Sequence, residues 1–306
     1  MSSKPISEFR QSPERPGIPA AVRFLLAAVL AIIVNSVLPV VCFALFGYHV
    51  VLADIAYRWS GSAILLGGFL LFARVLDQVE NDPWAYIGLP KERGDIRQSV
   101  IGVAIGALLI TLAVLVISVK GNLNLQVTAS GRAVVRALLV TVLLLGGAVL
   151  EELMFRGYPF QRLIEAIGAP GAILVLSAFF GAVHLGNPNA GGLWSWGFFN
   201  TLAVGVLFAV AYLRSRTLWL PIGIHFGWNF FLGVVYGLPV SGIKDFSVIV
   251  RSTAHGSRLL TGGPYGIEAS LTGSIVIVFG IFLVAFLPTS LLSGATEARR
   301  SGAESI

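Results

Sequence analysis

Long apolar runs constrain the fold of this chain of 306 residues more than any other feature. Inside a bilayer, an unpaired backbone N–H or C=O group costs several kcal/mol, so a spanning segment must form a helix or join a closed barrel. The runs hold 17 or more residues, which exceeds the ~9–11 residues of a membrane β-strand, and they show no period-2 alternation. We therefore predict an all-α fold, a polytopic membrane bundle of about eight transmembrane helices at residues 24–46, 60–76, 99–119, 133–163, 170–186, 194–213, 218–239 and 271–292.

The composition agrees with a membrane protein. Hydrophobic residues make up 56% of the chain and charged residues only 12%, whereas a soluble domain has about 25% charged residues. The net charge of +6 comes without a dense basic run, so we assign it to cytoplasmic loops and expect no nucleic-acid partner. The single cysteine, Cys42, excludes an intrachain disulfide and a cysteine-based metal site.

The Lys and Arg residues between the runs predict the orientation, because cytoplasmic loops carry an excess of them. With the N-terminus inside, fourteen fall on the cytoplasmic side and six, including Arg58, on the other side. We therefore expect a multi-pass protein of the plasma membrane with both termini cytoplasmic. The expected division is a cytoplasmic tail (1–23), N-terminal helices 1–3 (24–119), a second membrane domain (120–292) and a cytoplasmic C-terminal tail (293–306).

Ionisable residues interrupt three of the runs, and each is a functional-site candidate because a charge inside the membrane is costly. Glu152 and Arg156 are four residues apart and can pair on one helix face, while Glu151 points about 100° away without a local partner. We predict that Glu151 is the working acid and that Glu152–Arg156 is a structural ion pair. Two further runs contribute pairs of residues that are also four apart, namely Phe180–His184 and His225–Asn229.

The depths of these residues along their helices predict that they meet. With a rise of 1.5 Å per residue, Glu151 lies about 18 Å from the expected end of its helix near Leu163. His184 lies about 21 Å, and His225 about 10 Å, from the expected cytoplasmic ends of their helices. We therefore expect Glu151, His184 and His225 to share one cavity that opens to the cytoplasm.

This set of residues fits hydrolysis of an amide bond without a covalent intermediate. A carboxylate in an apolar site can take a proton from water, and a histidine beside it can orient that water or protonate the leaving amine. His225 and Asn229 can hold the oxyanion of the tetrahedral intermediate. No Ser or Cys stands in a recognisable nucleophile motif.

Other functions stay open from the residues alone. Glu151, His184 and His225 can also supply three ligands to a divalent metal such as zinc, although no His-Glu-x-x-His motif is present. Acid and histidine chains also form proton relays, so a proton-coupled transporter is an alternative, and so is a non-catalytic scaffold. Against the transporter, the polar residues cluster at one site and no duplicated half is visible.

Three motifs, in this order on separate helices, resemble those of the CPBP intramembrane proteases: Glu-Glu-x-x-x-Arg (151–156), Phe-x-x-x-His (180–184) and His-x-x-x-Asn (225–229). This family comprises type II CAAX prenyl endopeptidases and bacteriocin-processing or bacteriocin-immunity proteins. The resemblance covers about residues 135–235, and the later stretch GGPYGIEAS (262–270) is similar to a segment of bacterial members.

The resemblance implies an intramembrane endopeptidase, glutamate- or metal-dependent, whose catalytic domain is the segment 120–292. Its substrate would be a protein or peptide with a membrane-embedded or lipidated segment, held among membrane lipids; a non-catalytic immunity protein is the alternative within the family. By resemblance, Glu151 and His184 would activate water, and His225 and Asn229 would stabilise the oxyanion. The same resemblance gives a supporting role in the site to Glu152, Arg156 and Phe180.

Overall fold

Helices account for nearly all regular structure, which confirms the predicted all-α class. The computed structural model describes residues 18–47, 49–90, 95–119, 123–127 and 130–292. Most of the two expected tails, residues 1–17 and 293–306, therefore lies outside the described residues. The long helices are α1 (Ala20–Phe46), α2 (Val50–Val75), α4 (Asp95–Val119), α5 (Gly131–Arg156), α6 (Tyr158–Val183), α7 (Trp196–Ser215), α8 (Trp219–Phe230) and α10 (Leu271–Ala285).

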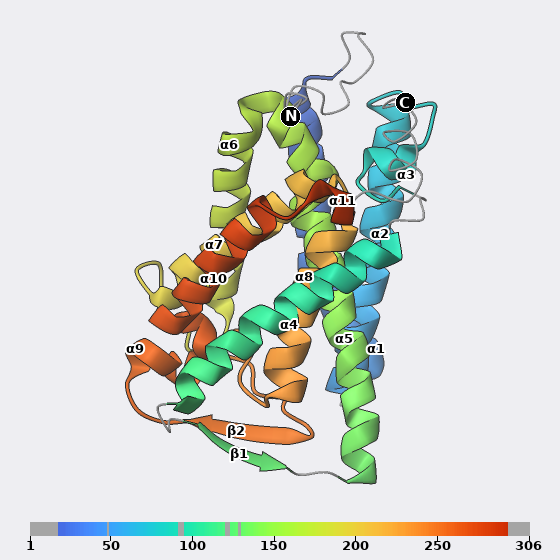
Figure 1. Ribbon diagram of the computed structural model, residues 1–306. Helices are drawn as coiled ribbons and strands as arrows, with labels where there is room; N and C mark the ends of the chain where they lie inside the picture. The colour runs from blue at the N-terminus through green and yellow to red at the C-terminus, as the bar shows by residue number, and fades with distance from the viewer. Residues whose placement is uncertain (1–17, 48, 91–94, 120–122, 128–129, 293–306) are drawn as a thin grey trace.

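Short elements connect these helices. Two strands that were not expected, β1 (Leu123–Val127) and β2 (Val250–Ala254), pair antiparallel with Leu123 opposite Ala254. They lie at one end of the bundle, whereas α1 begins and α10 ends toward the opposite end (Figure 1). The remaining short elements are α3 (Pro83–Tyr86), α9 (Arg258–Thr261), α11 (Thr289–Leu292), η2 (His184–Gly186), η3 (Phe231–Val235), η4 (Gly263–Tyr265) and η5 (Ile267–Ala269).

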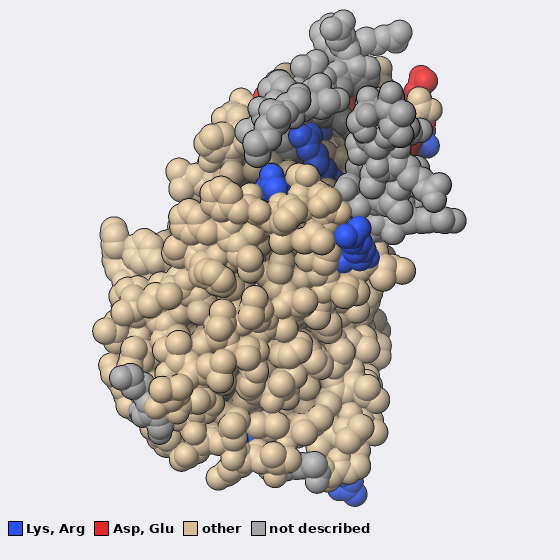
Figure 2. All heavy atoms as spheres, viewed as in Figure 1, with Lys and Arg blue, Asp and Glu red and all other residues tan. Residues whose placement is uncertain are grey.

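The lengths and surfaces of the helices show an integral membrane protein. Five described stretches are long and apolar enough to cross a membrane, and one of them, Gly131–Gly186, contains both α5 and α6. Trp219–Val235 and Leu271–Ala285 are shorter apolar helices, so the number of eight crossings stays a prediction. Large apolar side chains such as Val40 and Leu138 are more than 60% exposed. The middle of the face in Figure 2 carries almost no charge, as a lipid-facing surface requires.

The expected boundaries of two runs are wrong. The run at 133–163 was expected to be one helix, but α5 ends at Arg156 because Gly157 leaves the helical region with ψ −142°. The helix expected at 170–186 instead begins at Tyr158, with Pro159 in its first turn, and bends at Gly168, where φ is +78°. Residues 158–167 therefore form a separate short arm at the end of the bundle where α1 begins.

The second run also begins earlier than expected. The helix expected at 60–76 is α2, which starts at Val50 and therefore includes Asp54 and Arg58. Arg58 is thus part of a helix within the bundle, and its count among the basic residues of the far side of the membrane was wrong. This boundary matters because Arg58 extends into the site described below.

Two glycine pairs bring α4 and α8 into close contact. A Cβ atom at Gly106 would lie 2.4 Å from the Ile224 carbonyl oxygen, and one at Gly227 would lie 2.5 Å from the Val103 carbonyl oxygen. Gly102 and Gly223 meet the facing backbone in the same way, so each helix presents a Gly-x-x-x-Gly surface to the other. Such surfaces let membrane helices approach to backbone contact. The pair on α8 flanks His225, so this contact fixes the depth and rotation of that histidine.

A buried ion-pair cluster ties α1, α2 and α6 together at the end of the bundle where α1 begins. Asp77, just after α2, is 3% exposed and lies 2.7 Å from Nη1 of Arg162, and it accepts a hydrogen bond from Tyr158 Oη at 2.6 Å. Arg23 also pairs with Asp77 and lies 3.2 Å from Glu165. With two acids facing two bases, the charges balance, and the short arm at 158–167 is anchored to the first two helices.

Candidate active site

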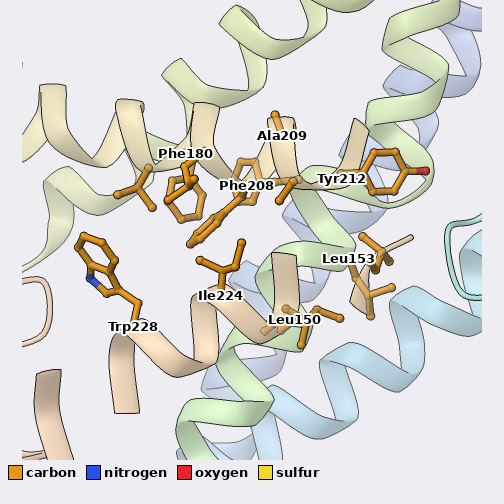
Figure 3. Packing of buried hydrophobic residues seen from close by; sticks show 14 of the residues in the cluster. Leu150, Leu153, Phe180, Phe208, Ala209, Tyr212, Ile224 and Trp228 are labelled. Atoms are coloured by element: carbon orange, nitrogen blue, oxygen red, sulfur yellow. The ribbon is translucent and has the colours of Figure 1, made fainter. Parts of the chain in front are cut away.

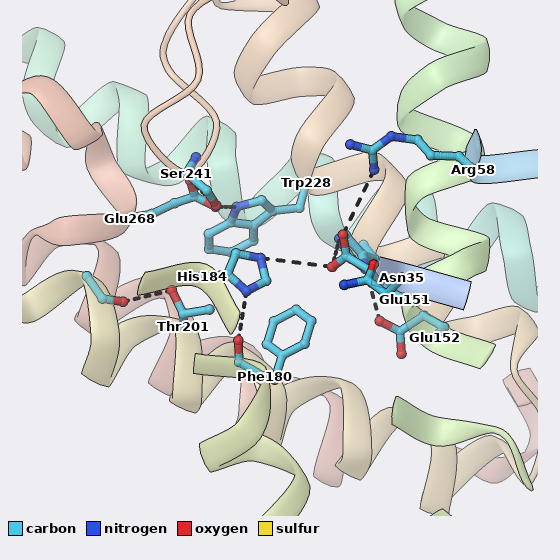
Figure 4. Close-up of polar contacts among 12 residues, drawn as sticks. Asn35, Arg58, Glu151, Glu152, Phe180, His184, Thr201, Trp228, Ser241 and Glu268 are labelled. Atoms are coloured by element: carbon cyan, nitrogen blue, oxygen red, sulfur yellow. Dashed lines mark hydrogen bonds and ion pairs between the residues drawn. The ribbon is translucent and has the colours of Figure 1, made fainter. Parts of the chain in front are cut away.

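Glu151 lies near the end of α5, and the two oxygens of its carboxylate have different surroundings. Oε2 lies 3.9 Å from Nε2 of His184 and 3.8 Å from Nε2 of His225. It is buried and accepts no hydrogen bond from another described residue. Oε1 lies 4.0 Å from Nη1 of Arg58 (Figure 4). The three residues predicted to meet therefore do meet, around one carboxylate oxygen.

His184 is held from its own helix. It is the first residue after α6, and its Nδ1 lies 2.7 Å from the Phe180 carbonyl oxygen, which can only accept a hydrogen bond. Nδ1 therefore carries the hydrogen, and Nε2 is left as an acceptor that faces Glu151. The ring also packs on that of Phe180 at 4.6 Å, which gives Phe180 the supporting position expected for it.

His225 is held by Glu152 and Phe208. Its Nδ1 lies 2.9 Å from Oε1 of Glu152, and its ring stacks on Phe208 at 4.8 Å with an interplanar angle of 18°. Figure 3 shows Phe208 in the core with Phe180, Ile224 and Trp228 nearby. The carboxylate and the stacked ring together fix the direction in which Nε2 points.

The Glu152–Arg156 pair forms as the helical spacing predicts, at 3.2 Å and with both residues at most 1% exposed. Arg156 also donates to the Gly205 carbonyl oxygen at 3.0 Å and lies over the Phe180 ring at 4.6 Å. The sequence did not predict that Glu152 also orients His225. One buried carboxylate thus connects the structural ion pair to the candidate catalytic histidine.

Asn229 lies one helical turn after His225 and lines the same cavity. It is half-buried and its side-chain amide makes no hydrogen bond to another described residue, so this amide is free to donate to a substrate. The cavity has a volume of about 240 Å³, and the side chains of Glu151, His184 and His225 all line it.

Arg58 is a site residue that sequence reasoning missed. It extends from α2 and lies 3.6 Å from Asp54 as well as 4.0 Å from Glu151. A Cβ atom at Gly147 would lie 2.3 Å from its guanidinium, so the Gly-Gly pair at 146–147 leaves the room that Arg58 occupies. Those two glycines, separated from Glu151 by three residues of the same helix, were the only signal in the sequence. Tyr57, next to Arg58, lines the cavity too and donates to Asn35.

Glu268 is a second acid in the cavity wall that was not predicted. It accepts a hydrogen bond from Trp228 Nε1 at 2.9 Å and bonds from the backbone N–H and hydroxyl of Ser241. Burial raises the pKa of Glu268, and it outweighs these hydrogen bonds, which lower it. The residue lies in the stretch GGPYGIEAS, whose similarity to bacterial members was noted without a role.

The cavity is also lined from outside the predicted site helices. Val240, Ser241 and Phe246 from the connection after η3 line it, and this connection folds back at the end of the bundle that carries the strands (Figure 1). The opening of the cavity toward the cytoplasm stays a prediction.

The three candidate metal ligands lie farther apart in the described geometry than bound zinc would hold them. Within the described parts of the chain, no group of three His, Cys, Asp or Glu side chains could hold an ion. Zinc bonds of ~2.0–2.2 Å in a tetrahedron place ligand atoms about 3.4 Å apart. The gaps from Glu151 to the two histidines are 3.8 and 3.9 Å, and two hydrogen bonds through a water molecule span such gaps.

Known proteins are similar to the part of the chain that carries most of these residues. Residues 133–231 match the Rce1-like family of type II CAAX prenyl endopeptidases. The resemblance inferred from three motifs is therefore confirmed for this region. All seven predicted site residues lie within it, whereas Arg58 and Glu268 lie outside it.

One curated relative extends this comparison. The chain is 31% identical over 103 residues to the "Putative membrane peptidase YdiL" of Bacillus subtilis (strain 168). The match covers 34% of this chain and spans 39% of the length of that relative. No solved structure matches the chain significantly. Over these residues the chain is therefore similar to membrane proteases.

Proposed function

We propose that this protein is an intramembrane endopeptidase that hydrolyses a peptide bond with water activated by Glu151 and His184. One observation carries the proposal: the buried Oε2 of Glu151 faces Nε2 of both histidines across gaps of 3.8 and 3.9 Å. A water molecule in this position has a carboxylate and an imidazole to accept its two hydrogens. Carboxylate and imidazole side chains are both among the groups that act as general bases in enzymes.

The first step is attack by this water. Its oxygen bonds to the carbonyl carbon of the substrate while one proton moves to Oε2 of Glu151. His184 accepts a hydrogen bond from the same water at Nε2, because its Nδ1–H is committed to the Phe180 carbonyl. The carbonyl π electrons move to oxygen and give a tetrahedral oxyanion.

The second step is collapse of the oxyanion. His225, as the imidazolium with a hydrogen on both ring nitrogens, donates from Nδ1 to Glu152 and from Nε2 to the oxyanion, and Asn229 donates from its side-chain amide. Glu151 passes its proton to the leaving nitrogen, the C–N bond breaks, and the products are an acid and an amine. We expect Asn229→Ala to lower kcat by ~10²–10³-fold, the usual cost of losing one oxyanion donor.

The surroundings of the site and the matched family both support one class of substrate. We propose a protein or peptide with a membrane-embedded or lipidated segment, including a prenylated one, as the name of the family suggests. The cavity lies between helices whose outer faces are apolar, so a substrate segment can approach from the bilayer.

The test is cleavage of a mixed peptide library by the purified protein in detergent, with Glu151→Gln in parallel. Wild type should cut, Glu151→Gln should not, and its thermal unfolding midpoint should stay close to wild type. Glu80→Gln, the same change at an exposed position, should cut normally. A chelator should leave cleavage unchanged, whereas loss with chelator and recovery with zinc would make the enzyme metal-dependent.

The same experiment separates the alternatives. A non-catalytic scaffold or immunity protein would leave the library intact at every protein concentration. A proton-coupled transporter would do the same, but in vesicles it would acidify the interior in a manner that Glu151→Gln abolishes. Cleavage that survives Glu151→Gln would remove Glu151 from the mechanism.

A further inference from the structure

A second cavity of about 910 Å³ lies at the end of the bundle that carries the strands. Its volume is in the range of ~300–1,000 Å³ that is usual for ligand pockets. Four basic residues and a single acidic one, Asp245, line it; we call it the basic pocket, and its basic residues are Arg132, Arg136, Lys244 and Arg251.

The four bases are exposed and available for a ligand. None of them forms an ion pair with a residue in the described parts of the chain. Arg132 and Arg136 are four residues apart on α5 and present to one side of it. Like charges that converge in a concave surface raise the local concentration of anions. Guanidinium groups in particular match the planar geometry of a carboxylate.

We call the cavity lined by Glu151, His184 and His225 the catalytic cavity. Only a thin partition separates it from the basic pocket. Consecutive residues of one segment face the two sides: Leu238 and Pro239 line the basic pocket, while Val240 and Ser241 line the catalytic cavity. A second segment repeats this pattern, since Gly266 lines the basic pocket and Glu268 the catalytic cavity. A chain that leaves the catalytic cavity across this partition would need only a few residues, at ~3.3 Å each, to reach the bases.

Strand β2, which lines the basic pocket, is also hydrogen-bonded to the end of the helix that carries His225 and Asn229. Ser252 of β2 donates its backbone N–H to the Gly237 carbonyl oxygen at 2.9 Å and its hydroxyl to the Tyr236 carbonyl oxygen at 2.5 Å. Tyr236 directly follows η3, which continues α8 beyond Asn229. A ligand held against β2 is therefore held at a fixed position relative to His225 and Asn229.

We propose that the basic pocket binds a carboxylate-bearing segment of the peptide substrate, a few residues from the bond that is cut. The inference rests on the proposed peptidase function and extends it to a substrate class, namely membrane peptides with an acidic flank. An anionic lipid headgroup has compatible charge, but the shared partition and the attachment of β2 to the helix that carries His225 favour the substrate.

The test measures binding rather than turnover. The full chain with Glu151→Gln is purified in a neutral detergent, and fluorescence anisotropy follows labelled peptides with one common apolar segment. Their flank is either three Glu or three Gln, each with an amidated or a free C-terminus. The peptide with three Glu should bind roughly tenfold more tightly at low salt, and the difference should shrink as salt screens the charges. The amidated and free forms distinguish side-chain carboxylates from a terminal one.

Paired variants then locate the effect. Arg136→Gln with Arg251→Gln should weaken binding of the acidic peptide roughly two- to tenfold and leave the neutral peptide unchanged. Arg136→Lys should retain most of the preference. Arg97→Gln, an exposed base on α4 outside the pocket, should have no effect. Thermal unfolding of each variant shows that it is folded, as expected for exposed positions.

Three results would overturn the proposal. They are equal binding of acidic and neutral peptides, an effect of Arg97→Gln as large as that of the paired pocket variants, or binding of anionic phospholipid nanodiscs at the same arginines without any peptide preference.

The peptidase function is tested separately from the pocket. If the wild type cuts nothing while the acidic preference persists, the pocket stands and the peptidase does not. If the wild type cuts acidic and neutral peptides equally well, and binding shows no acidic preference, the peptidase function stands and the proposed role of the basic pocket fails.

Discussion

At the scale of single residues, the site depends on what holds each oxygen of Glu151. Oε2 faces the histidines, while Oε1 faces Arg58 at 4.0 Å. Two unit charges at this separation interact by about 1 kcal/mol in water and about 4 kcal/mol near a protein surface. Without the cation, the carboxylate loses the group that fixes its rotation. We therefore expect Arg58→Gln to lower kcat roughly tenfold while the unfolding midpoint stays near wild type.

Arg58→Lys is the matched control, because it keeps the charge and should recover most of the rate. The kcat values of all three proteins on the best library peptide, with KM measured beside them, give the comparison. Wild-type kcat in Arg58→Gln would show that Glu151 is held by the histidines alone.

Glu152 carries two tasks, so its loss should have two consequences. Removing one member of a buried ion pair costs ~3–5 kcal/mol, because the partner charge is left uncompensated. Glu152→Gln should therefore lower the unfolding free energy by about that amount, and Arg156→Ala should lower it similarly. Glu152→Gln should also slow cleavage at a temperature where it is folded, since the neutral amide oxygen of Gln holds the Nδ1–H of His225 more weakly than the carboxylate does. A variant as stable and as active as wild type would refute both roles.

Glu268 should make stability depend on pH. Its pKa is raised by burial above the ordinary 4.5, so its contribution is fully present below pH 4.5 and is lost as the pH rises through the folded value. Each pH unit between the two values is worth about 1.4 kcal/mol. The unfolding midpoint of wild type should therefore fall more steeply above pH 4.5 than that of Glu268→Gln. Parallel curves for the two proteins would contradict this assignment.

At the scale of elements, the contact of α4 with α8 places His225 opposite Glu151. Gly106→Ala would put a Cβ atom 2.4 Å from the Ile224 carbonyl oxygen, so the helices must move apart. We expect a loss of ~1–3 kcal/mol in stability and lower activity. Gly67→Ala on α2 is the matched control, because nothing lies within 4 Å of its Cβ, and it should be neutral or stabilising. Equal behaviour of the two variants would mean that the helices tolerate separation.

The helices and the motif residues could be predicted because each leaves a local pattern in the sequence. Apolar length predicted the helices, and spacing by four predicted the pairs Glu152–Arg156, Phe180–His184 and His225–Asn229. Arg58 and Glu268 could not be predicted, since each meets the site through tertiary contacts with helices far away in sequence. The helix break at Gly157 was missed because apolar composition continues through it, whereas backbone conformation does not.

At the scale of the whole molecule, residues 133–231 do not contain every residue that shapes the site. Residues 133–231 contain all seven predicted site residues, but α2 supplies Arg58 and α4 supports α8 from outside it. The connection that follows α8 closes the cavity with Ser241 and Glu268. Part of the geometry that would decide what enters the site therefore comes from segments beyond the family match.

The orientation of the molecule in the membrane gives the last prediction. With Arg58 in the bundle, Lys and Arg still favour the end with the termini as the cytoplasmic one. The end of the bundle with β1 and β2 would then be the outer one, and the connection that supplies Val240 and Ser241 to the cavity would lie on that side. In a Cys42→Ser background, Thr253→Cys on β2 should react with a membrane-impermeant maleimide in intact cells. Asn81→Cys, exposed after α2, should react only once the membrane is permeabilised. The opposite labelling pattern would place the site on the cytoplasmic side and the termini outside.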